Sequence, residues 1–527
     1  MDQTYVTLAV SATIAVGVAV IVRRRGWGMA IPLIAVGAFV GWLPVGPSAP
    51  PDPEIILVAI LSPLVFGEAL SSSYLDLRRV SRPVLALAIG LVVATTLVIG
   101  AIGTVLVAMP VAMAMALGAV LAPTDAVAVS AVARRAGLPR RLVAILEGES
   151  LVNDGTGLTA LKVALVAAAA GSVTFLQVTG VFALAVIVGV AVGGVGGWLL
   201  SWVLRRSNDL VAANSLILVA PFLLYVVAEE LHGSGILAVV VAGLVIAHEQ
   251  HADPGHTGRV QSAIVWRHIT FVLQAIAFFL VGLELPDVIR RLDSSGLRSV
   301  AILVPVVVLA IIATRTVFVF GMTRFGRATM GGSTGTPLLR SAAIVSWASA
   351  RGPVSGLGAF SIPLVFAPGE PVPFRDVILA TTFCVIVITL LLSLTLAPLA
   401  RLIGVPKDDD DETLRRVDVL LARASIERLS DIEAESANDG HPLDPAAVER
   451  LREDVERRIR VATDPGSVTG TQELRTEQVI STAREMVRAE QEELIRLRDE
   501  EGLPDAIARP MLRELDMRAQ ALRVKRG

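Results

Sequence analysis

The chain has 527 residues, of which 54% are apolar and 18% are charged, and its formal net charge is −2. Residues 1–406 hold 25 basic and 19 acidic residues, about 11%, whereas the last 121 residues hold 21 and 29, about 41%. The long apolar runs of the first part exclude a water-soluble enzyme, and the single cysteine excludes a disulfide framework or a thiolate metal cluster. Neither part has a basic face with interleaved aromatic residues, so we expect no nucleic acid partner. We interpret residues 1–406 as a transmembrane domain and residues 407–527 as a cytoplasmic charged helical domain.

The first expected span is the apolar stretch 5–22. It precedes its basic residues Arg23, Arg24 and Arg25, which reverses the order found in a cleaved signal peptide. Apolar length and helical periodicity predict an all-α polytopic membrane fold of about thirteen transmembrane helices. Their expected ranges are 5–22, 27–43, 54–70, 84–108, 111–133, 141–169, 175–204, 210–231, 234–248, 268–285, 298–322, 339–366 and 376–402.

Arginines in the connections indicate the orientation. With the N-terminus outside, seventeen arginines fall in cytoplasmic loops and four in external loops, namely Arg290, Arg291, Arg298 and Arg375. This excess follows the positive-inside rule. It predicts a multi-pass protein of the cell membrane with the C-terminal domain in the cytoplasm.

Eight of the ionisable side chains inside the expected spans bear on function. Charges at that depth are costly unless they are paired or border water, so a group of them indicates an ion or proton path. For any one residue, a structural pair or a side chain that reaches out to the interface is the alternative. The eight are Glu68, Asp125, Glu147, Glu149, Asp154, Lys162, Arg315 and Arg351.

The sixth span contains EGESLVNDGTGL, residues 147–158. At about 100° per residue, Ser150 and Asn153 lie about 40° and 100° from Asp154 on one flank of the helix. Asp154 lies roughly 20 Å above the cytoplasmic end, near the bilayer midplane. A carboxylate beside hydroxyl and amide oxygens suits a small hard cation, and a desolvated carboxylate can hold a proton instead. Glu149 faces almost the opposite way, as expected of a structural charge pair, and Glu147 is placed to line an inner funnel.

Two spans carry breaks near their middle. In the fifth, Pro123 predicts an interruption, after which Thr124 or Asp125 caps the next half-helix; a simple proline kink is the alternative. In the twelfth, the break is Arg351, Gly352 and Pro353. The opposite charges at the two breaks compensate opposite helix poles. Spans five and twelve are seven positions apart in the order of spans, and because seven is odd they cross the membrane in opposite directions. Two six-helix repeats, spans one to six and eight to thirteen, would therefore have inverted topology, as in secondary transporters. Similar depth in the membrane further predicts a pair between Glu149 and Arg315, and Arg351 and Asp125 form the other candidate pair.

The motifs LAPTDAVAV, LEGESLVNDGTGL and SWASARGPVSGLGAFSIP resemble those of the sodium/proton antiporter family, the monovalent cation:proton antiporter group that includes animal sodium/hydrogen exchangers. The resemblance covers about residues 5–405. It implies thirteen helices with crossed broken helices, a homodimer, and exchange of Na⁺ or Li⁺, sometimes K⁺, for protons by an elevator-like movement. It implies that Asp154 binds the ion and exchanges the proton, Ser150 and Thr124 supply oxygens, Asn153 orients the site, and Arg315 and Arg351 brace it.

The third span departs from the family pattern. Where members often read Leu-Pro-Pro-Leu-Leu-Phe-Glu, this chain has LSPLVFGEAL, with Gly67 at the expected position and Glu68 one residue later. The shift of about 100° leaves open whether Glu68 reaches the site, and we interpret it as a gate. Lys162, eight residues after Asp154, is not expected from the family pattern, and the resemblance implies no role for it. A single exchanging carboxylate predicts one-for-one, electroneutral exchange.

A K⁺/H⁺ antiporter and, less favoured, a cation channel are the alternatives, although a channel would need repeated filter elements that the sequence does not contain. We expect no enzyme, no cofactor and no metal beyond the transported cation. The segment AHEQHADPGH lacks the zinc-protease spacing and is interpreted as a solvated loop. In the charged domain, helices are expected near 413–434, 445–462, 470–501 and 505–524, and this domain is expected to regulate or dimerise.

Overall fold

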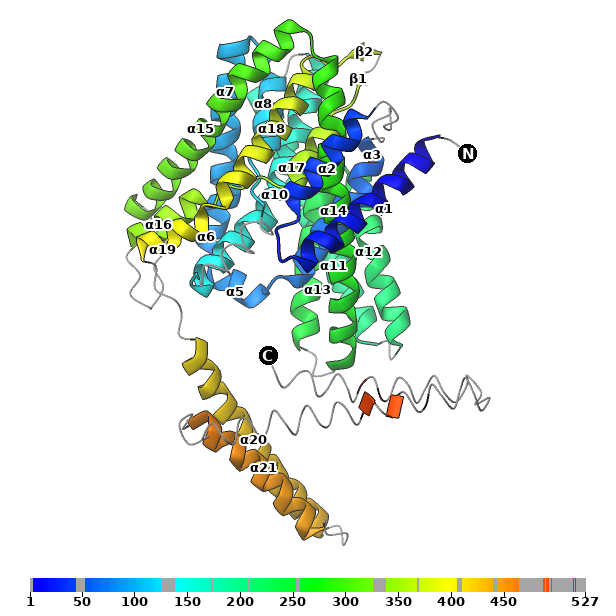
Figure 1. Cartoon of the computed structure of the whole chain (residues 1–527), viewed down its shortest axis with the longest axis vertical. Helices are drawn as coiled ribbons and strands as arrows, with labels where there is room; N and C mark the ends of the chain where they lie inside the picture. Colours follow the sequence, from blue (N-terminus) through cyan, green and yellow to red (C-terminus); the bar gives the residue numbers. More distant parts are fainter. Residues whose placement is uncertain are drawn as a thin grey trace. The chain divides into compact units, whose positions relative to one another are not determined.

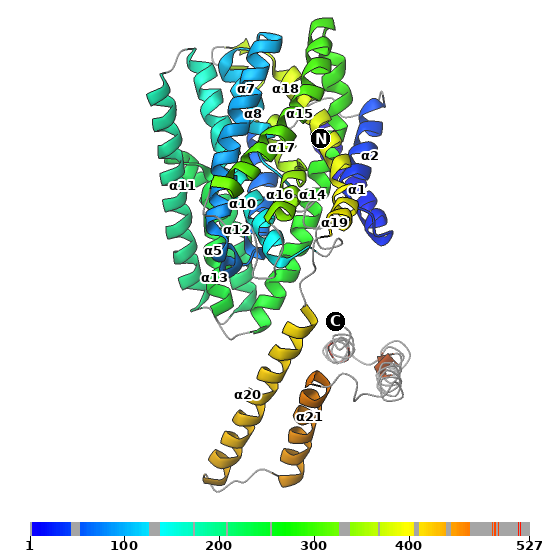
Figure 2. The same cartoon turned by 90° about the vertical axis from the view of Figure 1, so that its left-hand side faces the viewer.

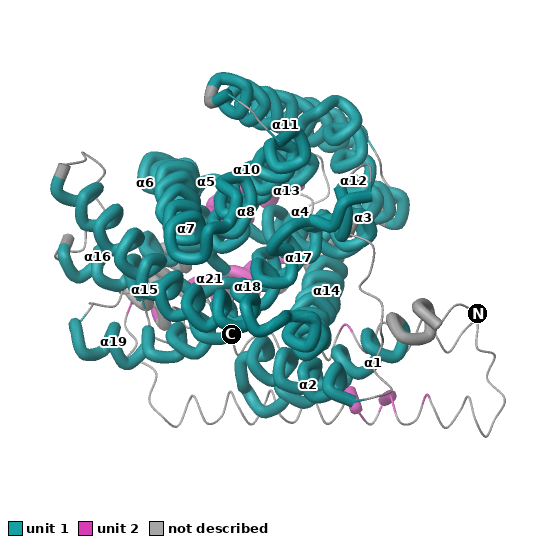
Figure 3. The backbone as a smooth tube through the Cα atoms, turned by 90° about the horizontal axis from the view of Figure 1, so that it is seen from above, with its two compact units in different colours: residues 1–408 teal, residues 409–527 magenta. Residues whose placement is uncertain are grey.

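The computed structural model describes residues 3–43, 53–125, 138–171, 174–206, 209–252, 256–325, 338–366, 369–404, 410–438 and 444–463, together with 487, 488, 490, 491, 494, 515 and 517. The chain divides into two compact units, Met1–Asp408 and Asp409–Gly527, coloured separately in Figure 3. The division falls beside the point where the charge density of the sequence changes.

Among its described residues, unit 1 has helices and one short β-hairpin as its regular elements (Figure 1). Its helices are α1 (Gln3–Arg24), α2 (Ala30–Trp42), α3 (Pro53–Ile55), the π-helical η1 (Ile56–Leu61), α4 (Ser62–Ser71), α5 (Tyr74–Arg79), α6 (Ser81–Leu85), the π-helical η2 (Ala86–Leu91), α7 (Val92–Val107), α8 (Val111–Leu121), α10 (Arg140–Ala170), α11 (Phe175–Leu204), α12 (Leu210–Glu230), α13 (Gly235–Ala252), α14 (His256–Arg291), α15 (Ser294–Phe325), α16 (Leu338–Trp347), α17 (Pro353–Phe360), α18 (Arg375–Ser393) and α19 (Leu396–Ile403). Strands β1 (Val365–Phe366) and β2 (Glu370–Pro371) form the antiparallel hairpin.

Seven helical segments of the described chain are long and apolar enough to cross a membrane: Ser81–Val107, Arg140–Ala170, Leu176–Leu204, Val211–Glu230, Ile264–Arg291, Ser294–Arg324 and Arg375–Ile403. Four shorter apolar helices accompany them: Ala30–Trp42, Ile56–Ser71, Val111–Leu121 and Gly235–Glu249. The expected all-helical, multi-pass membrane fold is therefore confirmed, with seven candidate spans among the described residues.

The helices of unit 1 pack in two sets. Helices α7, α8, α10, α15, α16, α17 and α18 contact one another, and α1, α2, α4, α11, α12, α13 and α14 form the second set. Helix α10 contacts α13, and α14 contacts α17 and α18, so these helices join the sets. Figure 2 places α11 at one edge of unit 1 and α1 and α2 at the opposite edge, with α8, α10 and α17 between them.

Helices α2 and α14 approach closely because glycines face each other's backbones. A Cβ atom on Gly37 would lie 2.3 Å from the Phe279 carbonyl oxygen, and one on Gly282 would lie 2.1 Å from the Ile34 carbonyl oxygen. Small residues allow such contacts between membrane helices, where close packing replaces the hydrophobic driving force.

Two expected ranges are corrected by the structure. The twelfth span was expected to be helical over 339–366, but α17 ends at Phe360 and the chain enters the β1–β2 hairpin. Pro363 explains this end, because proline disfavours helical backbone at the preceding residue. The segment expected to be a loop after the ninth span is largely helical, since α13 continues to Ala252 and α14 begins at His256.

Unit 2 contains α20 (Asp410–Asn438) and α21 (Pro445–Thr463), which pack side by side (Figures 1 and 2). Ala422 and Val448 are buried, and Arg452 forms an ion pair with Glu433 at 3.1 Å. The helices expected over 470–501 and 505–524 lie almost entirely outside the described residues.

Candidate functional site

The two predicted breaks meet in the middle of unit 1. Helix α8 ends at Leu121 and residues 122–125 are not helical, while residues 348–352 separate α16 from α17. The Asp125 N–H donates to the Ala350 carbonyl at 2.9 Å, so one break is hydrogen-bonded to the other. Gly352 lies directly against Asp125, because a Cβ atom there would be 2.5 Å from the Asp125 Cβ and Cγ atoms. The half-helix expected after Asp125 lies outside the described residues.

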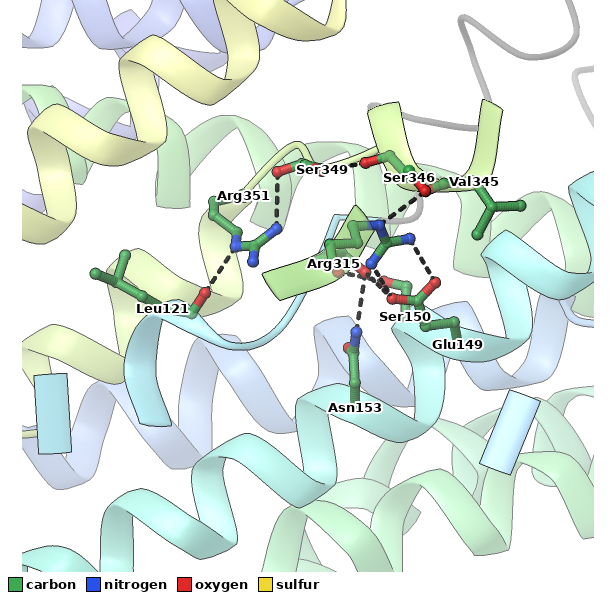
Figure 4. A network of polar contacts seen from close by, with 10 residues as sticks. Leu121, Glu149, Ser150, Asn153, Arg315, Val345, Ser346, Ser349 and Arg351 are labelled. Carbon is green, nitrogen blue, oxygen red and sulfur yellow. Dashed lines mark hydrogen bonds and ion pairs between the residues drawn. The ribbon is translucent and has the colours of Figure 1, made fainter. Parts of the chain in front are cut away.

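Arg351 stabilises the ends of two half-helices. Its buried guanidinium donates from Nε to the Leu121 carbonyl and from Nη1 to the Ser349 carbonyl, both at 2.7 Å (Figure 4). Exposed carbonyls give a helix C-terminus a partial negative charge, which a cation compensates. The sequence predicted a pair between Arg351 and Asp125. In the structure, the hydrogen bonds described for the Arg351 guanidinium are to backbone carbonyls, the Arg351 backbone N–H donates to the Thr389 hydroxyl at 3.1 Å, and the Asp125 N–H donates to the second break.

Arg315 and Glu149 form a bidentate ion pair, with each side chain only 1% exposed. Arg315 Nη2 lies 2.7 Å from Glu149 Oε2, and Nη1 contacts Oε1. Arg315 Nε also donates to the Val345 carbonyl in α16 at 2.8 Å (Figure 4). The planar guanidinium therefore connects α10, α15 and α16, as a bidentate arginine can and a lysine cannot.

Thr124 connects the first break to α10. Its carbonyl accepts the Ser150 hydroxyl at 2.5 Å, and its hydroxyl accepts from Asn153 Nδ2 at 2.9 Å. The same Thr124 hydroxyl donates to Glu149 at 3.4 Å. Ser150 and Asn153 thus hold the break in place, and the buried Asn153 Oδ1 atom has no hydrogen-bond partner among the described residues.

These contacts surround a small closed cavity. It is lined by Glu68, Pro123, Thr124, Asp125, Ser150, Asp154, Gly352, Pro353, Val354 and Ser355. Its room of about 10 Å³ is close to the least that holds one water molecule. The lining carries three carboxyl groups and no basic side chain, so the cavity suits a cation or a proton.

Asp154 presents an unsatisfied oxygen to this cavity. The side chain is 2% exposed, and its Oδ1 atom has no hydrogen-bond partner among the described residues. Buried carboxylate oxygens are almost always paired, because an unpaired one loses its hydration without compensation. A cation beside the carboxylate, or a proton on the carboxyl group, would compensate this loss.

Glu68 lies at the same cavity. It is reached from α4, and Gln274 of α14 donates to its Oε1 atom at 3.3 Å. The expected shift of about 100° between Gly67 and Glu68 assumed that the third span is one regular α-helix. In the structure, the π-helical η1 (Ile56–Leu61) interrupts this span with a wider turn. Glu147, by contrast, is half-buried in α10 and is not among the residues that line the cavity.

Lys162 has a partner that the sequence analysis missed. Its Nζ atom lies 2.5 Å from Glu229 Oε2, at the end of α12, and 3.1 Å from the Gly233 carbonyl. Glu229 is a carboxylate within the expected eighth span, 210–231, and this was the available signal. Gln274 and Ser355, also near the site, carried no charge that could single them out.

The fold and site define a multi-pass membrane protein in which the non-helical residues after α8 meet the break between α16 and α17 beside a buried carboxylate. A family model described as "Sodium/hydrogen exchanger, transmembrane" matches residues 9–402. The chain therefore belongs to the sodium/hydrogen exchanger family, and this confirms the resemblance that the three motifs indicated.

Curated relatives and a solved structure agree with this assignment. The chain is 34% identical to the sodium, potassium, lithium and rubidium/H⁺ antiporter of Bacillus pumilus over 70% of this chain, and it spans 57% of that relative's length. It is 28% identical to an uncharacterized Na⁺/H⁺ exchanger of Mycobacterium bovis over 97% of this chain and 95% of that one. The sodium proton antiporter MjNhaP1 of Methanocaldococcus jannaschii shares the fold, with a TM-score of 0.64 at 21% identity over 76% of this chain and 99% of that one.

Proposed function

We propose that the protein is a secondary active transporter that exchanges a monovalent cation, foremost Na⁺, for protons across the cell membrane. The observation that carries this proposal is the buried Asp154 carboxylate, whose Oδ1 atom has no hydrogen-bond partner among the described residues, in the wall of a small cavity where the end of α8 meets the break between α16 and α17. The names of several relatives support cation/proton exchange. Because the Bacillus pumilus relative is named for four cations, Li⁺ and K⁺ remain candidate substrates, and K⁺/H⁺ exchange is the second candidate function.

In this mechanism, cation and proton compete for Asp154. The cavity holds about one small particle, so binding of the cation requires that the carboxylate has released its proton. Thr124, Asp125 and Ser150 offer further oxygens from the cavity wall, and Asn153 orients Thr124. Alternating access then exposes the same site first to one side of the membrane and then to the other.

The neighbouring charges have structural roles in the proposal. Glu149 with Arg315 braces the helix that carries Asp154, and Arg351 keeps the two breaks together. Glu68 acts as a gate at the cavity, and Glu147 lines the funnel that leads to it. No cofactor takes part, and the protein transports ions rather than catalysing a reaction.

The exchange is proposed to be electroneutral. If Asp154 carries either one proton or one cation per half-cycle, and the other carboxyl groups do not change protonation, no net charge moves. In proteoliposomes, a change of membrane voltage should leave the exchange rate unaltered. A cation-dependent current would show instead that a second group exchanges protons.

The proposed architecture has thirteen spans in two inverted six-helix repeats, an external N-terminus and a homodimeric assembly. The uneven distribution of arginines supports this topology. Residues 407–527 would form a cytoplasmic domain that regulates or dimerises the transporter.

The test is a pH-gradient assay in vesicles containing the purified protein. Na⁺, Li⁺, K⁺ and Rb⁺ are added in turn, and recovery of a pH-sensitive dye reports proton movement. Dissipation by Na⁺ at the lowest concentration is expected. Dissipation by K⁺ alone would favour the second candidate, and no response to any of the four cations would refute the proposal.

A further inference from the structure

Ser355 differs from most buried hydroxyl groups of unit 1. Thr159 donates to the Gly155 carbonyl at 2.6 Å and Thr389 to the Val385 carbonyl at 2.9 Å, which is how a hydroxyl is usually satisfied inside a membrane helix. Ser355 is 2% exposed, yet its Oγ atom has no hydrogen-bond partner in the described part of the chain.

The position of Ser355 explains why it lacks a local partner. It lies in the first turn of α17, two residues after Pro353, so the carbonyl four residues earlier belongs to Arg351 in the unwound segment. A buried hydroxyl without a hydrogen bond is costly, because it loses its hydration without compensation. Ser355 lines the cavity that Asp154 also lines, and a ligand in this cavity would compensate the cost.

Ser355 lines the same cavity as Asp154. Two residues that line one cavity of about 10 Å³, Ser355 of α17 and Asp154 of α10, thus each carry a buried oxygen, Oγ and Oδ1, without a hydrogen-bond partner among the described residues. They do not satisfy each other by a direct hydrogen bond. One cation bound between charged and neutral oxygens satisfies both atoms at once.

We propose that Ser355 Oγ is a ligand of the transported cation and favours Li⁺ and Na⁺ over K⁺ and Rb⁺. This inference rests on the proposed cation/proton exchange and extends the ligand set to the second broken helix. The number and strength of coordinating oxygens decide how well a site replaces the water shell of an ion. Small cations hold that shell most tightly, so they lose most when one oxygen is removed.

A ligand role differs from a structural role in what it changes. A serine hydroxyl does not titrate in the physiological range, so its loss should weaken cation binding without moving the pH profile measured at saturating cation. Loss of packing at Ser355 would instead lower the maximal rate for all cations alike.

The experiment compares Ser355→Ala with the unaltered protein in vesicles, measuring KM for Na⁺, Li⁺, K⁺ and Rb⁺ from pH-gradient dissipation. We expect KM for Na⁺ and Li⁺ to rise about tenfold, and KM for K⁺ and Rb⁺ to rise less than about threefold. Ser361→Ala is the matched control, because Ser361 follows the same half-helix and its hydroxyl donates to the Gly358 carbonyl at 2.7 Å. The control should keep the KM values of the unaltered protein.

Two further variants keep the test decisive if Ser355→Ala is inactive. Ser355→Thr retains the hydroxyl and should keep the preference for Na⁺, whereas Ser355→Cys retains the size and should lose it. The reverse order, or an unchanged ratio of the Na⁺ and Rb⁺ KM values in Ser355→Ala, would overturn the ligand role while leaving cation/proton exchange intact. If the unaltered protein dissipates no gradient with any cation, the proposed function itself fails, and the ligand role fails with it.

Discussion

The buried ion pair between Glu149 and Arg315 allows a quantitative prediction. Both side chains are 1% exposed, and Arg315 makes two contacts with Glu149 in addition to its bond to the Val345 carbonyl. Removing one partner leaves the other charge buried and uncompensated, which typically costs 3–5 kcal/mol. Glu149→Gln and Arg315→Met should therefore each lower the free energy of unfolding by roughly that amount.

The double variant separates the pair from its members. Because Glu149→Gln combined with Arg315→Met leaves no uncompensated charge, its loss of stability should be smaller than the sum of the two single losses by about 2 kcal/mol or more. The measurement is equilibrium unfolding in mixed micelles, followed by tryptophan fluorescence. Single variants that lose less than about 1 kcal/mol, or losses that simply add, would refute the view that this pair is desolvated and coupled.

Two other predictions follow from local geometry. Gly352→Ala should lower the free energy of unfolding by about 1–3 kcal/mol and abolish exchange, because the new methyl group would lie 2.5 Å from Asp125 atoms. Gly194→Ala is the control, because a Cβ atom at this position of α11 has no neighbour within 4 Å. Equal stability and activity of the two variants would contradict the close contact. The Gly296 N–H donates to Asp293 and lowers the pKa of that carboxyl group, so the carboxylate stabilises the fold above its unfolded pKa, and this contribution is lost as pH falls through the lower folded pKa. The melting temperature of Asp293→Ala should consequently be lower than that of the unaltered protein at pH 7, and the two melting temperatures should converge in strong acid. A difference in melting temperature that persists at low pH would contradict this role of Asp293.

The central site was largely predictable because its signals are local. Pro123 and Pro353 interrupt the helices whatever packs around them. Carboxylates inside apolar spans are rare because burying them costs free energy, so each one indicates a special role. Depth along each helix also brought Glu149 and Arg315 to the same level before their contact was known. These inferences needed only helix geometry and the cost of buried charge.

Other features depend on packing that the sequence does not display. A π-helical turn cannot be recognised from apolar residues alone, so the approach of Glu68 to the cavity was not predictable from a regular projection. Arg351 reaches the carbonyl of Leu121, which is 230 residues away in the chain. Ser355 gave no signal because serine is common in membrane helices, and what distinguishes it is an unsatisfied hydroxyl on a residue that lines the cavity.

The central claim is that cation and proton compete for Asp154. The most direct measurement is Na⁺-dependent dissipation of a pH gradient in proteoliposomes containing Asp154→Asn, which keeps the size of the side chain and removes its charge. The account predicts no exchange with any cation, while size-exclusion chromatography shows the same folded species as the unaltered protein. Exchange retained by Asp154→Asn would contradict the account.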